Sequence, residues 1–402
     1  MLDETVDTLL VIFVIAVVSP IVADLFRRIH LTDLVVEILL GVVVGPQVLG
    51  VAHLTLPITT LSSIGLSVLM FLAGYELDFA KVRGAPVRLA SIGWLISLAI
   101  GLSAGALAQL GGRAVSWIVI GLALTTTALA TLMPMWRDSD LLSPHFATHG
   151  LAVGTVGEFG PIVAVSVFLS SDSPIGTSLL LVVFVFVAAG AALVATRQKS
   201  TWLVRALKRH TDSSSQLPVR ATTLVLVFLL WLSYKFGLDV LLGAFAAGIV
   251  VRLGTGGIDT DTLEVKIDAI GYGLLIPVFF VVSGMQLDVE GLVHDPFDLL
   301  RLPIFLAAFL VARGVPVFLL YRKTLTRQEQ WPFALFSATA LPLVVVISEI
   351  AVHQGQLSPA SAATLVGAAV LSVILYPALA FHLLSRAHRS AGGVRPAPEP
   401  PV

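Results

Sequence analysis

The architecture of this chain is predicted most directly by residues 150–165, which read Gly150-Leu-Ala-Val-Gly-Thr-Val-Gly157-Glu158-Phe-Gly-Pro161-Ile-Val-Ala-Val165. The run lies inside a long apolar segment, so Glu158 is expected at the centre of a membrane. A carboxylate there costs roughly 2.5–3.5 kcal/mol on insertion scales and usually faces a polar cavity. Because Pro161 has no N–H, the Gly157 carbonyl loses its helical donor. The pair predicts a cation or proton site; the alternative is a kinked packing helix with a protonated, hydrogen-bonded Glu158.

The composition of the whole chain is that of a membrane protein. The 402 residues are 57% hydrophobic and 12% charged, whereas soluble domains average about 25% charged residues. This predicts an all-α polytopic membrane protein. The net charge of −1 gives no indication of a nucleic-acid partner. The start, Met1-Leu-Asp-Glu4, is acidic, which favours a retained first span over a cleaved signal.

Hydropathy predicts about 13 transmembrane helices joined by short connections. A transmembrane domain over 1–390 is expected, followed by a disordered tail at 391–402. The predicted spans are 7–26, 32–50, 58–77, 88–110, 115–134, 146–170, 175–196, 217–236, 238–252, 266–286, 300–321, 331–352 and 359–385.

The basic residues predict the orientation of the chain. With the N-terminus outside, the inner loops hold 20 of the 24 Lys and Arg residues. The outer loops hold only Arg113, Lys235 and Arg301, and Arg313 lies inside a span. By the positive-inside rule, the N-terminus is outside and the C-terminus cytoplasmic.

Two halves of the chain resemble each other. The segment Gly74-Tyr-Glu-Leu-Asp78 ends the third span, and Gly284-Met-Gln-Leu-Asp288 ends the tenth, 210 residues later. Thr127-Ala-Leu129 recurs as Thr339-Ala-Leu341 after 212 residues. We therefore expect repeat one at about 7–170, a connector helix at 175–196 and repeat two at about 217–385. Seven spans separate matched partners, an odd number, which predicts the inverted repeats of secondary transporters.

Two spans contain hydroxyl-rich interruptions at equivalent positions of the repeats. The first is Thr125-Thr126-Thr127, and the second includes Ser337, Thr339 and Pro342. Discontinuous helices place free backbone groups at the midplane, where inverted repeats form ion sites. The alternative is that the hydroxyls only bond to carbonyls of their own helix.

Two further charged residues fall within predicted spans. Arg313 lies in the middle of the eleventh span, where an arginine requires a partner. Pro316 should free the Ala312 carbonyl beside it. Both Arg313 and Glu158 lie near mid-depth, so we expect them to meet, directly or through water; the alternative is a purely structural ion pair. Glu349, two turns after the second interruption, is a possible second acid nearer the outer surface.

Several motifs, taken in order, resemble the sodium/proton exchanger domain. They are Gly41-x-x-x-Gly45-Pro46-x-x-Leu49-Gly50, Phe71-Leu-Ala-Gly74-Tyr-Glu-Leu-Asp78, the Thr-Thr-Thr-Ala interruption, Leu242-Gly-Ala-Phe-Ala-Ala-Gly248 and Phe279-Phe-Val-Val-Ser-Gly284-Met. The resemblance covers about residues 8–385 and is strongest to the Kef/Nap-type branch of the monovalent cation:proton antiporters.

The resemblance implies the antiporter fold with crossed broken helices, and a homodimer in which a six-helix core moves against a dimerisation domain. It places the ion-binding acid on Glu158, the core basic residue on Arg313, and Thr126 or Thr127 beside the ion. Electrogenic members carry two adjacent Asp where this chain has Gly157-Glu158. A single exchangeable carboxylate is therefore expected.

The expected function is exchange of H⁺ for Na⁺ or K⁺ by alternating access, with Glu158 binding either one. The protein is expected to be no enzyme, to need no cofactor or resident metal, and to lie in a bacterial inner membrane. A cation-coupled symporter of an organic anion remains an alternative, since Arg313 could bind a carboxylate. A gated cation channel is a further alternative, although no carbonyl filter motif or charged ring is present.

Overall fold

The structure is a computed structural model that describes residues 2–26, 32–76, 84–110, 116–137, 142–168, 190, 215–255, 260–294 and 296–390. The predicted connector 175–196, apart from residue 190, and the predicted tail 391–402 lie outside these residues.

The described part of the chain is helical throughout, and every predicted span with described residues corresponds to one helix or to helical pieces in line. In the first half these are α1 (Leu2–Leu25), α2 (Asp33–Val44), α3 (Leu56–Tyr75), α4 (Ala85–Leu110), α5 (Trp117–Ala123), α6 (Leu129–Arg137) and α7 (Pro144–Phe168). The second half begins with α10 (Leu217–Lys235), α11 (Val240–Gly254), α12 (Thr260–Ile270), the π-helix η2 (Gly271–Leu275) and α13 (Ile276–Gln286). It continues with α14 (Val289–His294), α15 (Pro296–Phe309), the π-helix η3 (Leu310–Gly314), α16 (Val315–Leu320), the short 3₁₀ turn η4 (Tyr321–Lys323), α17 (Arg327–Ser337), α18 (Pro342–His353) and α19 (Pro359–Ser390).

Nine helical stretches among the described residues are long and apolar enough to cross a membrane. The first, α1, has 24 residues, which at 1.5 Å per residue is about 36 Å, more than the hydrocarbon core of a bilayer. The chain is therefore an integral membrane protein.

The predicted span at 32–50 is shorter than expected. Helix α2 ends at Val44, and Gly45 is extended with φ −65° and ψ 172°. Pro46 is the physical cause, since its ring disfavours the helical conformation of the residue before it. After a turn in which Gly50 has a positive φ of 62°, the chain reaches α3.

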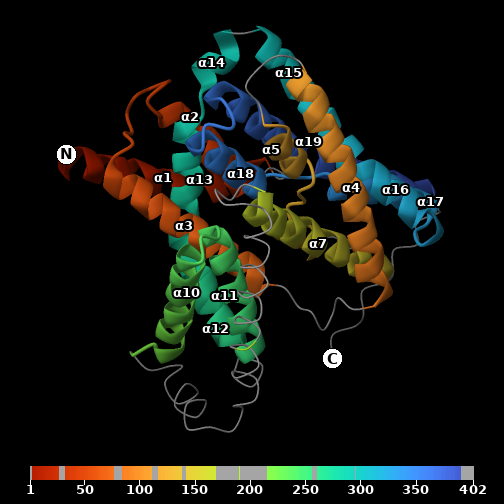
Figure 1. The fold of residues 1–402 in the computed structure, drawn as a ribbon, viewed down its shortest axis with the longest axis horizontal. Helices are drawn as coiled ribbons and strands as arrows, with labels where there is room; N and C mark the ends of the chain where they lie inside the picture. The colour runs from red at the N-terminus through yellow and green to blue at the C-terminus, as the bar shows by residue number, and fades with distance from the viewer. Residues whose placement is uncertain are drawn as a thin grey trace.

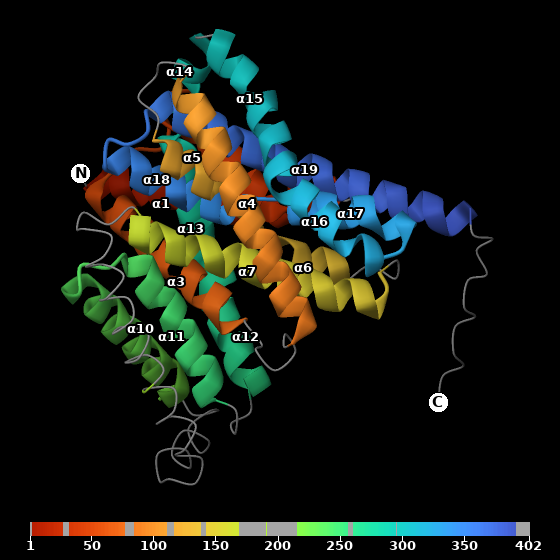
Figure 2. The ribbon, with the colours of Figure 1, turned by 45° about the vertical axis from the view of Figure 1, so that its right-hand side comes forward.

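The elements surround a central group of helices. Figures 1 and 2 show α7, α13 and α18 in the middle, and α10, α11 and α12 together at one end, away from α14 to α17. Helix α3 packs on α11, α2 packs on α13, and α4 packs on both α5 and α7. Long helix α19 covers α15 and α17. The two interrupted spans, α5–α6 and α17–α18, are thereby enclosed by intact helices.

Glycines allow two of these helix pairs to touch backbone to backbone. A side chain at any of four glycines would collide with a backbone carbonyl of the facing helix. The pairs are Gly41 with Val281 and Gly284 with Ile38, between α2 and α13, and Gly74 with Phe245 and Gly248 with Phe71, between α3 and α11. The two sets match residue by residue: 207 residues separate α2 positions from α11 positions, and 210 separate α3 positions from α13 positions.

Candidate functional site

The two interruptions meet at the centre of the protein. Helix α5 ends at Ala123 and α6 begins at Leu129, while α17 ends at Ser337 and α18 begins at Pro342. The backbone N–H of Ala128 donates to the Thr339 carbonyl oxygen at 2.8 Å, which joins one interruption to the other. Non-helical backbone at membrane depth must be buried or line a cavity, and residues 124–128 and 338–341 are all buried.

Glu158 lies on α7 against the start of the half-helix α6. Its side chain is buried, with 9% of its surface exposed, and its Oε1 accepts a hydrogen bond of 2.9 Å from the Leu129 backbone N–H. Leu129 is the first residue of α6, so the carboxylate caps a helix end that carries unsatisfied N–H groups and positive partial charge. The half-helix therefore stabilises negative charge on Glu158.

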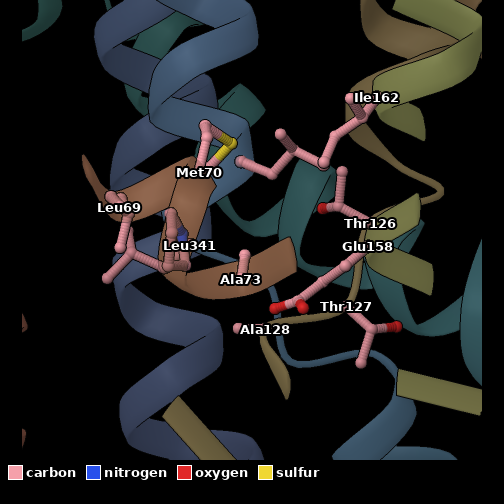
Figure 3. Close-up of a pocket in the computed structure, with 11 residues that line it drawn as sticks. Leu69, Met70, Ala73, Thr126, Thr127, Ala128, Glu158, Ile162 and Leu341 are labelled. Atoms are coloured by element: carbon pink, nitrogen blue, oxygen red, sulfur yellow. The ribbon is translucent and has the colours of Figure 1, made fainter. Parts of the chain in front are cut away.

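A small cavity lies beside this carboxylate. It has a volume of about 20 Å³, which is enough for about one water-sized guest. Figure 3 shows Glu158, Thr126 and Thr127 on one side and Leu69, Met70 and Ala73 of α3 on the other. Ala128, Ile162, Leu341, Pro342 and Leu343 complete its lining. The cavity thus has both interruptions, α7 and α3 as its walls.

Pro161 frees the Gly157 carbonyl, as predicted, but that oxygen has another donor. The backbone N–H of Thr127 donates to the Gly157 oxygen at 3.1 Å. The expectation that the carbonyl stands open beside the carboxylate is therefore wrong. Its role is to fix the first interruption against α7.

Arg313 is 1% exposed and lies in the π-helix η3, between α15 and α16. Its Nε and Nη2 donate to Thr127 Oγ1 at 3.0 and 2.7 Å, and Nη2 also donates to the Val153 carbonyl oxygen at 3.2 Å. Within the described chain, none of its hydrogen bonds goes to Glu158, so the predicted direct ion pair does not form. The two residues approach each other through Thr127 and the backbone of Gly157.

Gly157 is what permits this arrangement. A β-carbon at this position would lie 2.6 Å from Arg313 Nη2 and 2.7 Å from Thr127 Oγ1. Either distance is too short for a real contact, so the guanidinium and the hydroxyl occupy the space that a side chain would need. A second acid at position 157 has no room here unless Arg313 or Thr127 moves.

The hydroxyls of the interruptions divide into two kinds. Thr126 donates to Ala123, Ser337 to Ala334 and Thr339 to Leu335, all within their own helical segments. Only Thr127 donates across the interruptions, to the Ser337 carbonyl oxygen at 2.7 Å. The alternative of local bonding therefore holds for three predicted residues, whereas their backbone groups or positions still form the crossing.

Sequence analysis missed Ser372 of α19, which holds the second interruption. The Ala340 backbone N–H donates to Ser372 Oγ at 3.0 Å, and Ser372 Oγ lies 2.9 Å from the Ala340 carbonyl oxygen as a donor. A serine in a long apolar helix gives no sequence signal of such a role. Glu349, the possible second acid, does not line the Glu158 cavity and lies beside a different one.

Comparison with known proteins places this geometry in a context. A family model described as "Sodium/hydrogen exchanger, transmembrane" matches residues 13–386. The putative Na(+)/H(+) antiporter YjbQ of Bacillus subtilis is 27% identical over 397 residues, covering 94% of this chain and 63% of the relative. The Na(+)/H(+)-K(+) antiporter GerN of Bacillus cereus is 24% identical over 291 residues, covering 71% of this chain and 73% of the relative.

Among solved structures, the sodium proton antiporter MjNhaP1 of Methanocaldococcus jannaschii has the same fold. The TM-score is 0.66 at 20% identity, and the match covers 95% of this chain and 99% of that one. The fold class predicted from the sequence is thereby confirmed.

Proposed function

We propose that the chain, which belongs to the sodium/hydrogen exchanger family over residues 13–386, exchanges protons for monovalent cations, Na⁺ or K⁺, across a membrane. The chain spans 63% of the length of its Bacillus subtilis relative, so the activity is proposed for the transmembrane unit. The observation that carries the proposal is Glu158, a buried carboxylate in a cavity between the two interruptions and α3.

The proposed mechanism is competition for one carboxylate. Glu158 takes either a proton on an oxygen or a cation in the adjoining cavity of about 20 Å³. The oxygens of Thr126 and Thr127 lie on the same cavity wall, and such hard oxygen ligands suit alkali cations. When the site is loaded, its negative charge is neutralised, which lowers the cost of moving it past the apolar wall of α3.

Arg313 acts in this proposal as a positioning residue. Its guanidinium fixes Thr127, and Thr127 in turn donates its backbone N–H to Gly157 and its hydroxyl to Ser337. Arg313 does not line the cavity of Glu158. This argues against the symporter alternative, in which the guanidinium would bind the carboxylate of an organic substrate.

We also propose two inverted repeats at about 7–170 and 217–385, with Ser337, Thr339 and Pro342 in the second as counterparts of the first interruption. The matched glycine contacts, at constant separations of 207 and 210 residues, support this arrangement. A homodimer, a bacterial inner membrane and an outside N-terminus remain part of the proposal, on the basis of the family resemblance and the charge distribution.

The proposal is tested by flux in proteoliposomes with an imposed pH gradient. Glu158→Gln should fold, as judged by size-exclusion chromatography, and should lose Na⁺- or K⁺-dependent proton movement. Glu37→Gln is the matched control, since Glu37 is also a buried acid, 3% exposed, but does not line the cavity. Exchange at the wild-type rate by folded Glu158→Gln would exclude this site, and flux that runs down a cation gradient without proton exchange would favour a channel.

A further inference from the structure

A second cavity, of about 300 Å³, lies between α13, α18 and α19 and shares no lining residue with the cavity of Glu158. Its α19 wall is formed by Pro359, Ala362 and Val366. Its polar groups come from α13, with Ser283 and Gln286, and from α18, with Ser348, Glu349 and His353. The cavity is thus polar on two of its three sides, and the mechanism above makes no use of it.

Two hydroxyls on its walls lack hydrogen-bond partners. Ser348 is 2% exposed and Ser283 is 6% exposed, and the Oγ atom of each is buried without a partner. Serines in apolar helices ordinarily donate to a carbonyl of their own helix, as Ser337 does here. Because buried hydroxyls are nearly always satisfied, these two side chains are suited to a guest in the cavity.

Glu349 lies on the same face of α18 as Ser348. Val345, Ser348, Glu349 and Val352 all line the cavity, and their spacing of i, i+3, i+4 and i+7 places them along one side of the helix. From the elements that surround Glu349, His353 is the only other titratable side chain that lines the cavity among the described residues. The carboxylate therefore faces two free hydroxyl oxygens and the amide of Gln286.

This set of oxygens indicates the class of guest. Carboxylate, hydroxyl and amide oxygens are ligands for hard cations. Divalent ions are usually held by several carboxylates, whereas Glu349 supplies one negative charge, which one monovalent cation neutralises. We propose that Glu349, Ser283 and Ser348 bind a second alkali cation, at a site separate from Glu158.

The position of this site relates it to exchange. The first turn of α18, with Pro342 and Leu343, lines the Glu158 cavity, and the later turns line the second cavity. Seven residues separate Pro342 from Glu349, a rise of about 10 Å along the helix. The second site therefore holds a cation close to Glu158 on the side toward which α18 runs. The assignment rests on the proposed function only for the kind of cation, Na⁺ or K⁺.

The test measures cation binding in the absence of the first site. Purified Glu158→Gln is heated in increasing NaCl or KCl, with choline chloride holding the ionic strength constant. Its unfolding midpoint should rise with Na⁺ or K⁺, and Glu158→Gln/Glu349→Gln should show no rise. Replacing both Ser283 and Ser348 by Ala in Glu158→Gln should raise the half-saturating concentration by about tenfold or more, since each hydroxyl contributes a ligand to a charge.

Two controls keep the result interpretable. Glu158→Gln/Glu290→Gln, which removes an exposed acid outside the cavity, should keep the cation response. Glu158→Gln/Glu349→Asp, which retains the charge, should fold and respond more weakly if the Gln variant fails to fold. A midpoint of Glu158→Gln that ignores Na⁺ and K⁺, or a response that survives Glu349→Gln, would overturn the second site without touching the exchange assay. A Glu349-dependent response in a protein that shows no exchange would instead overturn the proposed function alone.

Discussion

Thr127 joins three parts of the core through a single oxygen atom. Its Oγ1 accepts from Nε and Nη2 of Arg313 and donates to the Ser337 carbonyl oxygen. A buried guanidinium without acceptors carries a large desolvation penalty. The hydroxyl of one residue therefore stabilises a charge on η3 and the position of α17 together.

Thr127→Val should destabilise the protein by about 2–3 kcal/mol, because it removes hydrogen bonds to a buried charged group. Thr127→Ser keeps the hydroxyl and should recover most of this stability. The measurement is the unfolding midpoint in detergent. Thr125→Val is the matched control, since the Thr125 hydroxyl is equally buried but donates only to Leu122 of its own helix. Equal midpoints for the Thr125 and Thr127 valine variants would contradict this role.

Gly157→Ala should lower stability by about 1–3 kcal/mol, as overpacking of a filled core does, and should impair exchange. The added methyl group would push Arg313 and Thr127 apart at the position where Glu158 is held. Gly273→Ala is the control, because a β-carbon on that helical glycine meets nothing within 4 Å. Unfolding midpoints and proteoliposome flux for both variants check the prediction, which fails if the two alanine variants behave alike.

At this scale the sequence predicted charges better than their partners. Glu158 and Arg313 stand out because a charge at membrane depth is costly, and the structure brings both to the crossing. The partner of Arg313 was mispredicted, because spacing along two helices gives depth but not the direction of a side chain. Ser372 was missed, because its bonds go to a segment 32 residues away, a distance that no local pattern encodes.

The interruptions are elements whose irregular backbone must be completed by neighbours. For the second, this neighbour is α19, through Ser372 and Ala340. Ser372→Ala should destabilise the protein by about 1–3 kcal/mol, since it leaves the buried Ala340 amide without an acceptor. Ser385→Ala, on the same helix, removes a surface hydroxyl that donates to His382 and should change stability by less than about 0.5 kcal/mol. Equal unfolding midpoints for the two variants would show that Ser372 does not hold the interruption.

The prediction of elements from the sequence was accurate for long apolar runs and weaker where helices change form. The interruptions were located by their hydroxyls and Pro342, and α18 begins at that proline. Around Arg313, however, Pro316 was expected to leave a free carbonyl. The chain forms a π-helix instead, in which the Val315 N–H reaches the Leu310 carbonyl. Such a local widening depends on the packing of η3 against α4 and α17, which composition does not reveal.

For the whole molecule, the single carboxylate in the cavity predicts the charge moved in each cycle. Either one H⁺ or one monovalent cation neutralises Glu158, and position 157 has no room for a second acid. Both loaded forms then carry the same charge, so exchange should be one for one and electroneutral. Solid-supported-membrane electrophysiology beside a pH-dye assay on the same proteoliposomes should show flux without a sustained current.

The opposite result would have a defined cause. A current that grows with imposed voltage and disappears in Glu349→Gln would contradict electroneutral exchange. It would make Glu349 a second transporting acid, although it lies beside a different cavity. Glu290→Gln again serves as the control.

The bond from the Ala128 amide to the Thr339 carbonyl uses main-chain atoms only. No substitution that keeps an N–H at position 128 can remove it, so an alanine scan would pass over the contact that joins the halves. Proline at 128, or an ester in place of the peptide N–H, is the smallest chemical change that would reach it. Side chains around the ion can therefore drift over evolutionary time while the crossing itself is inherited unchanged.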